Sequence, residues 1–236
     1  MYNRESKILI IVPSYNESMN IEQTLTHLSQ LKTHFANLQI CVINDGSHDD
    51  TSQKAKTFDV VVIDLPFNLG IGSAVQTGYK YAFKNEYDIA IQFDADGQHN
   101  VEDLIDLLTP IFEDEADMVV GSRFVEKTDY KGAITRRIGI FYFYFLLKVL
   151  TGKRFTDPTS GYRAKTKPVI KEFAENYPKD YPEPEVLVSL TNKKYRIKEI
   201  KVNMKDRQGG KSSINLVKSV YYMGKVSLSI IMQKLK

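Results

Sequence analysis

The stretch "DIAIQFDADGQHN", residues 88 to 100, joins a short apolar run to two aspartates two positions apart. An apolar run of this length, closed by polar residues, is typical of a strand buried on both faces of a parallel sheet. Aspartates are common in turns, but Asp94 and Asp96 would repel each other there, and a bound cation relieves that repulsion. Mg²⁺ and Mn²⁺ bind oxygen ligands, commonly one or two carboxylates with substrate phosphate. Asp94, Asp96 and the amide oxygen of Gln98 are therefore candidate metal ligands, and His99 is either a further ligand or a surface residue near the turn.

The same strand pattern recurs along the first half of the chain. Apolar runs predict strands at residues 7–13, 38–44, 59–65, 88–93 and 117–124. Apolar residues at helical spacing predict helices at residues 20–35, 72–84 and 101–108, the last ended or kinked by Pro110. This alternation predicts an α/β fold built on a mostly parallel sheet.

Polar segments follow each predicted strand. They read "PSYNE", "NDGSHDDT", "LPFNLGIGSA", "DADGQH" and "GSRF". Ligands of open parallel sheets bind beyond the carboxyl ends of the strands, so five such segments together predict a binding site. The glycines of "NLGIGSA" allow the backbone to approach a ligand closely, although this segment is neither a P-loop nor a dinucleotide fingerprint.

The bulk composition is that of an ordinary globular protein. Of the 236 residues, 42% are hydrophobic and 26% are charged. The single cysteine, Cys41, excludes an intrachain disulfide and lies in an apolar run, so we expect it in the core. The polar N-terminal residues do not resemble a signal peptide, which leads us to expect a cytoplasmic protein.

Charge is divided unevenly along the chain. Residues 189–236 hold 12 basic and 2 acidic residues, whereas residues 1–188 hold 20 and 27. A basic segment on an acidic body suggests a surface that meets phosphate groups of a nucleotide, a nucleic acid or a lipid, and the alternative is a solvated tail.

Two segments of the C-terminal half suggest contact with a membrane. The aromatic run "IGIFYFYFLLKVL", residues 138–150, is shorter than a bilayer span, so we expect a buried or membrane-touching helix. Residues 214–236 combine apolar residues at roughly helical spacing with lysines only, which predicts an interfacial helix. The alternatives are packing on the protein, a homo-oligomer interface or a small membrane partner. Residues 195–204 alternate like a strand.

The order of seven segments, "VPSYNE", "INDGSHDDT", "NLGIGSAVQTG", "FDADGQH", "GSRF", "DPTSGYRA" and "RQGGKSSI", resembles the family 2 glycosyltransferases. The resemblance covers about residues 7–215 and is closest to the polyprenyl-phosphate branch, which includes dolichyl-phosphate mannose synthase. It implies the glycosyltransferase type A fold, a Rossmann-like, mostly parallel sheet flanked by helices. We expect a catalytic domain at residues 1–212 and an amphipathic basic helix at residues 213–236.

The resemblance also implies roles for single residues. The nucleotide sugar would be bound by a set in which Asp45 contacts the base: Pro13, Tyr15, Glu17, Asp45, Gly70, Asp94, Arg207 and Lys211. Asp94, Asp96 and Gln98 would hold the metal on the diphosphate, over which Arg207 and Lys211 would close. Arg123, with Arg136 or Arg137, would bind the acceptor phosphate. Asp96, Arg123 and Arg207 are thus the expected catalytic residues, and the anomeric centre would be inverted.

The acceptor is less well defined by the residues. A sugar hydroxyl needs a general base, for which Glu183 and Glu185 in "YPEPE" are candidates, although a proline-rigidified loop explains them equally. A phosphate monoester, with a second pKa of about 6, needs positioning by arginines and no base. The basic residues near the predicted site favour the phosphate. Asp157 in "DPTSG" is expected to be a cap or turn residue or to orient the acceptor.

We therefore expect an inverting, metal-dependent glycosyltransferase that moves a sugar from a nucleoside-diphosphate sugar, a UDP-sugar by preference, to polyprenyl (undecaprenyl) phosphate. It would act at the cytoplasmic membrane face in cell-surface polysaccharide synthesis, with no nucleic acid partner. One rival is transfer to a sugar hydroxyl of a lipid-linked glycan. Another is a sugar nucleotidyltransferase, which would need a Gly-rich basic loop after the first strand, where "VPSYNESMN" stands. A non-catalytic nucleotide-binding module would not need the metal triad.

Overall fold

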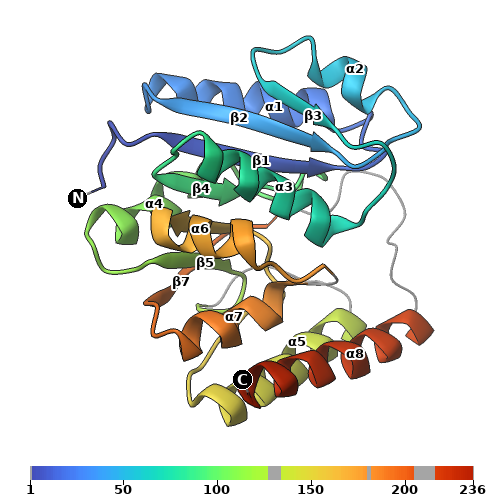
Figure 1. Ribbon diagram of the computed structural model, residues 1–236, viewed down its shortest axis with the longest axis vertical. Helices are drawn as coiled ribbons and strands as arrows, with labels where there is room; N and C mark the ends of the chain where they lie inside the picture. Colours follow the sequence, from blue (N-terminus) through green and yellow to red (C-terminus); the bar gives the residue numbers. More distant parts are fainter. Residues whose placement is uncertain (1, 127–133, 180–181, 205–215, 236) are drawn as a thin grey trace.

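The computed structural model describes residues 2–126, 134–179, 182–204 and 216–235, with the backbone alone for 134–136, 216–222 and 233–235. A seven-stranded mixed sheet runs through it in the order β3-β2-β1-β4-β6-β5-β7 (Figure 1). The strands are β1 (Ile8–Ser14), β2 (Leu38–Asn44), β3 (Val61–Asp64), β4 (Ile89–Gln92), β5 (Met118–Ser122), β6 (Arg163–Thr166) and β7 (Ile197–Lys201).

The centre of the sheet is β1, which pairs in parallel with β2 and β4. Ile11 lies opposite Cys41 on one side and Gln92 on the other. Every residue of β1 is buried, as its unbroken apolar sequence predicts. The expected strands and the burial of Cys41 are confirmed.

Strand β6 is not predicted from its sequence, "RAKT", because this sequence has no apolar pattern. It lies antiparallel between β4 and β5, with Arg163 opposite both Gln92 and Val120. Next to it, β5 and β7 pair in parallel, so the sheet is mixed yet mostly parallel. The expected fold class is confirmed.

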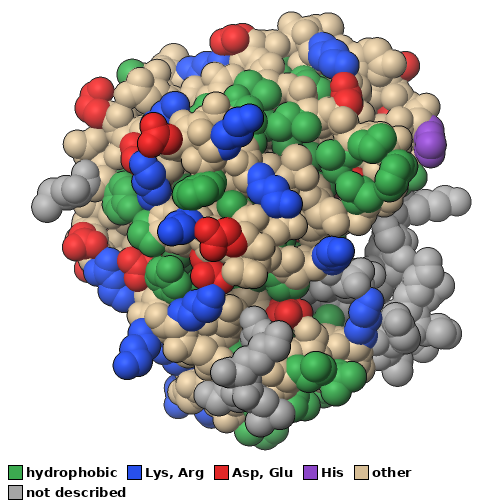
Figure 2. All heavy atoms as spheres, in the orientation of Figure 1, with side chains coloured by type: hydrophobic (Ala, Val, Ile, Leu, Met, Phe, Trp, Pro, Cys, Tyr) green, Lys and Arg blue, Asp and Glu red, His purple; other side chains and the backbone are tan. Residues whose placement is uncertain are grey.

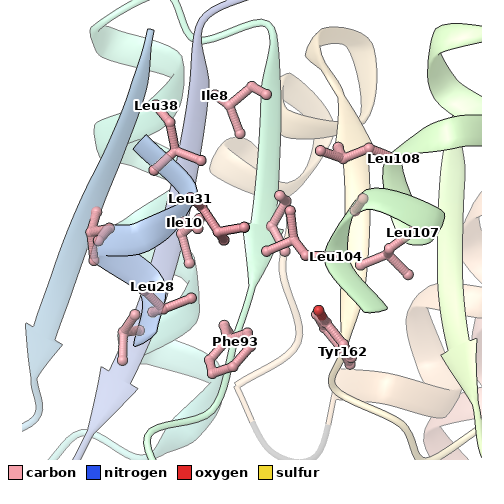
Figure 3. Close-up of a cluster of buried hydrophobic side chains, with 14 of the residues drawn as sticks. Ile8, Ile10, Leu28, Leu31, Leu38, Phe93, Leu104, Leu107, Leu108 and Tyr162 are labelled. Atoms are coloured by element: carbon pink, nitrogen blue, oxygen red, sulfur yellow. The ribbon is translucent and has the colours of Figure 1, made fainter. Parts of the chain in front are cut away.

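Helices cover both faces of the sheet. On one face lie α1 (Ile21–Gln30), followed by the short η1 (Leu31–Thr33), and α4 (Asp103–Phe112). Figure 3 shows their leucines directed at Ile8 and Ile10 of β1 and at Phe93, which directly follows β4. The other face carries α3 (Ile71–Lys84) and α6 (Lys167–Glu175), and the short α2 (Thr51–Ala55) lies beside β2 and β3.

The expected helix at residues 101–108 differs at both ends. It begins at Asp103 and does not stop at Pro110 but continues to Phe112. Pro110 is buried, and its neighbour Ile111 belongs to the core cluster that packs against the sheet. Helix α4 therefore continues past a proline, a residue that usually ends a helix, at a place where the helix is buried.

A third group of helices lies at the β7 end of the molecule. It consists of α5 (Ile134–Thr151), α7 (Pro182–Asn192) and α8 (Leu216–Leu235), with α5 and α8 side by side (Figure 1). The Tyr142 and Ser227 hydroxyls lie 2.8 Å apart and join α5 to α8. Ser229 donates to Glu185 over 2.6 Å and joins α8 to α7. Within the described residues, every helix is too short or too polar to cross a bilayer.

Candidate active site

The carboxyl ends of β1, β2 and β4 border a cavity of about 500 Å³. Seven residues expected to bind the nucleotide sugar or the metal line it, namely Pro13, Tyr15, Glu17, Asp45, Gly70, Asp94 and Asp96. The cavity therefore lies where a binding site is expected in an open parallel sheet, because side chains far apart in the sequence meet at the carboxyl ends of the strands.

Asp45, directly after β2, is hydrogen-bonded to the residues that precede α3. Its carboxylate oxygens accept hydrogen bonds from the backbone N–H of Leu69, at 2.8 Å, and of Gly70, at 3.0 Å. Gly70 has a φ of 87°, a left-handed conformation that glycine adopts at little cost. The first turn of α3 thereby opens towards the cavity, with Ile71 and Ala74 in its wall.

The segment after β1 is held by its own side chains. Asn20 donates to Glu17 Oε2 over 2.8 Å, and the Glu17 N–H donates to Thr51 Oγ1 over 2.9 Å. The Tyr15 ring meets His48 edge-on, with the ring centroids 6.5 Å apart. These contacts tie the β1 and β2 ends together, so Tyr15 and Glu17 stand on one wall of the cavity.

Asp94 and Asp96 lie in the segment directly after β4, which forms another wall of the cavity. Gln92 Nε2 donates to Asp94 Oδ1 over 3.4 Å, and the Gln98 N–H donates to Asp96 Oδ1 over 3.1 Å. Both carboxylates line the cavity, whereas Gln98 is not among its lining residues. Within the described residues, no three His, Cys, Asp or Glu side chains are grouped to hold a metal. The role of the Gln98 amide as a ligand stays a prediction.

His99 is not the surface residue that one of its two interpretations expected. It is buried, and the Asp94 N–H donates to its Nδ1 over 3.1 Å. Burial lowers the pKa of the imidazole to about 4, since desolvation disfavours the charged form. The ring is therefore neutral near pH 7, and it lies inside the protein, behind the cavity wall, where it contacts the Asp94 backbone.

Arg123 is buried in contact with Asp157. The Arg123 Nε and Nη2 atoms lie 2.6 and 2.7 Å from the two Asp157 oxygens, and Nη2 also reaches Thr159 Oγ1 at 3.2 Å. Glu199 in turn accepts from the Asp157 N–H at 3.0 Å, and burial raises the pKa of Glu199. Asp157 is thus more than a cap or turn residue. Phosphate binding by Arg123 stays a prediction.

The candidate bases differ in their surroundings. Glu183 and Glu185 do not lie in a rigid loop but in α7, which begins at Pro182, where a proline costs no hydrogen bond. Burial raises the pKa of Glu183, opposed by the nearby Arg163. Arg163 donates to the backbone oxygens of Ser160, Pro158 and Glu183 over 2.7 to 3.0 Å. Glu185 faces α8 instead, through Ser229.

The remaining expected residues lie elsewhere. Arg137 is exposed on α5, and the side chain of Arg136 lies outside the described residues, as do Arg207 and Lys211. The cavity also has a lining residue that no motif indicated, Lys179, which comes from the segment between α6 and α7. The backbone carbonyl of Lys179 would be 2.1 Å from a Cβ placed on Gly72, so this segment lies directly on α3.

The comparisons with known proteins define the class. The family model described as "Glycosyl transferase family 2" matches residues 9–177, and the chain belongs to this family. It is 38% identical over 161 residues to an uncharacterized protein of Methanocaldococcus jannaschii, covering 68% of this chain and 65% of the relative. The chain thus spans slightly less than two thirds of that relative.

Two further similarities are informative. The chain is 32% identical over 186 residues to a UDP-N-acetylglucosamine–dolichyl-phosphate N-acetylglucosaminyltransferase of Methanococcus voltae, covering 71% of this chain and 72% of the relative. Glucosyl-3-phosphoglycerate synthase of Mycobacterium tuberculosis, solved with Mn²⁺, UDP and phosphoglyceric acid, superposes with a TM-score of 0.77. That match covers 97% of this chain and 78% of the synthase at 17% identity, and it confirms the type A glycosyltransferase fold.

Proposed function

We propose that this protein transfers a sugar, with inversion, from a UDP-sugar to a polyprenyl phosphate at the cytoplasmic face of the membrane. The observation that carries the proposal is the joint placement of Asp45, Asp94 and Asp96 around one cavity at the strand ends. Relatives named for transfer to dolichyl phosphate and undecaprenyl phosphate support the choice of acceptor.

The metal site rests on two carboxylates. Asp94 and Asp96 line the cavity together, and two carboxylates with phosphate oxygens make a usual Mg²⁺ or Mn²⁺ site. The divalent ion would stabilise the negative charge of the leaving diphosphate. Asp94 and Asp96 would orient that ion, while the first turn of α3 and Lys179 border the same space.

The proposed acceptor would be bound by positively charged side chains and would not need a general base. A phosphate monoester is largely dianionic at pH 7 and attacks without losing a proton to the enzyme. Arg137, exposed on α5, is available to such a phosphate. Arg123 is buried and paired with Asp157, so it would reach the phosphate only from within the protein. The alternative, a hydroxyl acceptor, has one supporting observation, the half-buried Glu183, whose pKa is raised by desolvation. Glu183→Gln should keep transfer to a phosphate and abolish transfer to a hydroxyl.

The membrane face is proposed from the outer surface of α5 and α8. On α5, exposed apolar side chains recur at intervals of three and four residues, namely Ile138, Phe141, Tyr142, Phe145 and Val149. On α8, Leu228, Ile231 and Met232 are exposed, and Figure 2 shows hydrophobic side chains at the surface there. The Tyr142–Ser227 contact joins the two stripes.

Charge makes this surface suitable for anionic lipid. Neither helix contains an acidic residue, and Arg137, Lys148 and Lys225 are exposed on them. Each basic residue near an anionic bilayer contributes about 1 kcal/mol, and inserted apolar side chains add to this. Within the C-terminal segment 213–236, the described helix α8 would then act together with α5 and not by itself.

Flotation with anionic liposomes tests the membrane proposal. Phe141→Ser combined with Phe145→Ser should reduce binding strongly, because both side chains are exposed, at 70% and 61%. Phe83→Ser is the control, since Phe83 is an exposed phenylalanine on α3. Equal flotation of both variants, or no flotation of the unmodified protein at low salt, would refute lipid contact through α5.

The donor is tested with a panel of labelled nucleotide sugars and undecaprenyl phosphate, with mass analysis of the extracted lipid. A labelled lipid formed only with UDP-sugars, and abolished by Asp96→Asn, supports the proposal. Label transfer from a non-uridine donor would show that the proposed UDP-sugar donor is wrong. Undiminished product in excess chelator would show that transfer does not need a metal ion.

A further inference from the structure

His99 lies behind the metal-binding wall and contacts Asp94 twice. The Asp94 N–H donates to His99 Nδ1 over 3.1 Å, and His99 Nε2 lies 3.6 Å from Asp94 Oδ2. Because Nδ1 accepts a hydrogen bond, the proton of the neutral ring is on Nε2. That N–H therefore lies near the Asp94 carboxylate, at a distance slightly longer than a hydrogen bond.

Aromatic contacts fix the plane of the His99 ring. It stacks on Tyr162 with centroids 4.6 Å apart and planes 12° apart, and it meets Phe93 edge-on at 5.2 Å. The Tyr162 hydroxyl donates to the Asn100 backbone oxygen over 3.1 Å. The stack thus connects β6 to the segment that carries the two aspartates.

A second cavity, of about 330 Å³, borders His99, Phe93 and Gly97. The ring therefore has open space near it as well as packed neighbours. Its orientation rests on the Tyr162 stack and on the two contacts with Asp94. A buried imidazole needs a polar partner, and the partner of Nδ1 is the backbone N–H of the expected metal ligand Asp94.

We propose that His99 is a positioning residue for the metal site. Its Nδ1 accepts the hydrogen bond from the Asp94 N–H and so fixes the Asp94 backbone, which orients the Asp94 carboxylate towards the cavity where the cation and the diphosphate would bind. The inference rests on the proposed metal site, and it adds a residue that supports a ligand without binding the ion. Groups that orient metal ligands typically change metal affinity about 10- to 100-fold when they are lost.

Two substitutions separate positioning from packing. His99→Phe keeps an aromatic ring on Tyr162 but removes the acceptor for the Asp94 N–H. His99→Asn keeps an acceptor near the position of Nδ1 but removes the ring. A packing role predicts that the phenylalanine variant is the better of the two in every measurement. A positioning role predicts that the asparagine variant binds metal more tightly even though it melts at a lower temperature.

The measurement is Mn²⁺ binding in the presence of UDP, followed by the electron paramagnetic resonance of free Mn²⁺, together with thermal unfolding of the metal-free proteins. We expect His99→Phe to raise the Mn²⁺ dissociation constant about 10-fold or more, and His99→Asn to raise it less. If His99→Asn binds Mn²⁺ no more tightly than His99→Phe, the proposal is wrong. If the unmodified protein binds no Mn²⁺, or Asp96→Asn binds it equally well, the metal site itself fails and this inference fails with it.

Discussion

Gly161 lies against the carboxylate of Asp94. A Cβ placed on Gly161 would be 3.1 Å from Asp94 Oδ2 and 2.9 Å from Gln92 Nε2, both closer than side chains normally pack. Gly161 and Tyr162 directly precede β6. The position of this antiparallel strand therefore places Tyr162 on the His99 ring and a residue without a side chain beside Asp94.

The first prediction follows from that contact. Gly161→Ala should displace the Asp94 side chain and lower both Mn²⁺ affinity and transfer at least several-fold, while the protein still folds. Gly139→Ala on α5 is the matched control, since a Cβ there meets nothing within 4 Å. In a helix the control should be neutral or stabilising by about 0.5–1 kcal/mol. Unchanged metal affinity in Gly161→Ala would contradict the prediction.

The second prediction concerns the buried Arg123–Asp157 pair. Asp157→Ala leaves a buried guanidinium without its main counter-charge, which typically costs about 3–5 kcal/mol. Urea unfolding should show this loss. Asp59→Ala is the control, because its ion pair with Lys32 leaves the Asp59 side chain 95% exposed and should matter little. Similar small losses in both variants would show that the buried pair is not required.

The third prediction concerns pH. Burial favours a higher pKa for Asp64, but hydrogen bonds from Lys56, Ser52 and Asn44 outweigh it and lower the pKa to about 2. The unfolded carboxyl has a pKa of about 3.9, so its stabilising contribution is complete above that pH and is lost as the pH falls towards 2. The stability difference between the unmodified protein and Asp64→Asn should therefore shrink below pH 4. A difference that stays constant from pH 6 to pH 2.5 would contradict it.

The fourth prediction concerns Lys179. If its ammonium group contacts the donor diphosphate, Lys179→Ala should weaken UDP-sugar binding about 10-fold, as a charge-assisted contact contributes about 1.5–3 kcal/mol. Lys171→Ala, an exposed lysine on α6, should bind the donor normally. Isothermal titration with Mn²⁺ present measures both, and equal affinities would exclude Lys179 from the donor site.

The sequence predicts the parts of this protein that follow one local rule. β1, β2 and β4 are nearly continuous apolar runs, and the aspartates after β4 lie where parallel strands direct their ligands. β6 follows no such rule. Arg163 and Lys165 are buried there, and Arg163 is satisfied by carbonyls that include Glu183, 20 positions away. No local pattern contains that information.

The same limit explains His99 and Lys179. His99 reads as a turn residue because Tyr162, on which it stacks, lies 63 positions further along the chain. Lys179 lies in no motif and reaches the cavity only because its segment packs on Gly72. Pro182 and Pro184 suggested a rigid loop, yet both fit the first turn of α7.

The central claim is that a lipid phosphate, and not a sugar hydroxyl, receives the sugar. One competition measures this directly. The enzyme is given one labelled UDP-sugar and equal amounts of undecaprenyl phosphate and an undecaprenyl-diphosphate-linked hexose, and the labelled lipids are separated by mass. We expect label on undecaprenyl phosphate, with Asp96→Asn inactive. Label on the lipid-linked hexose, or on neither lipid with any donor of the panel, would contradict it.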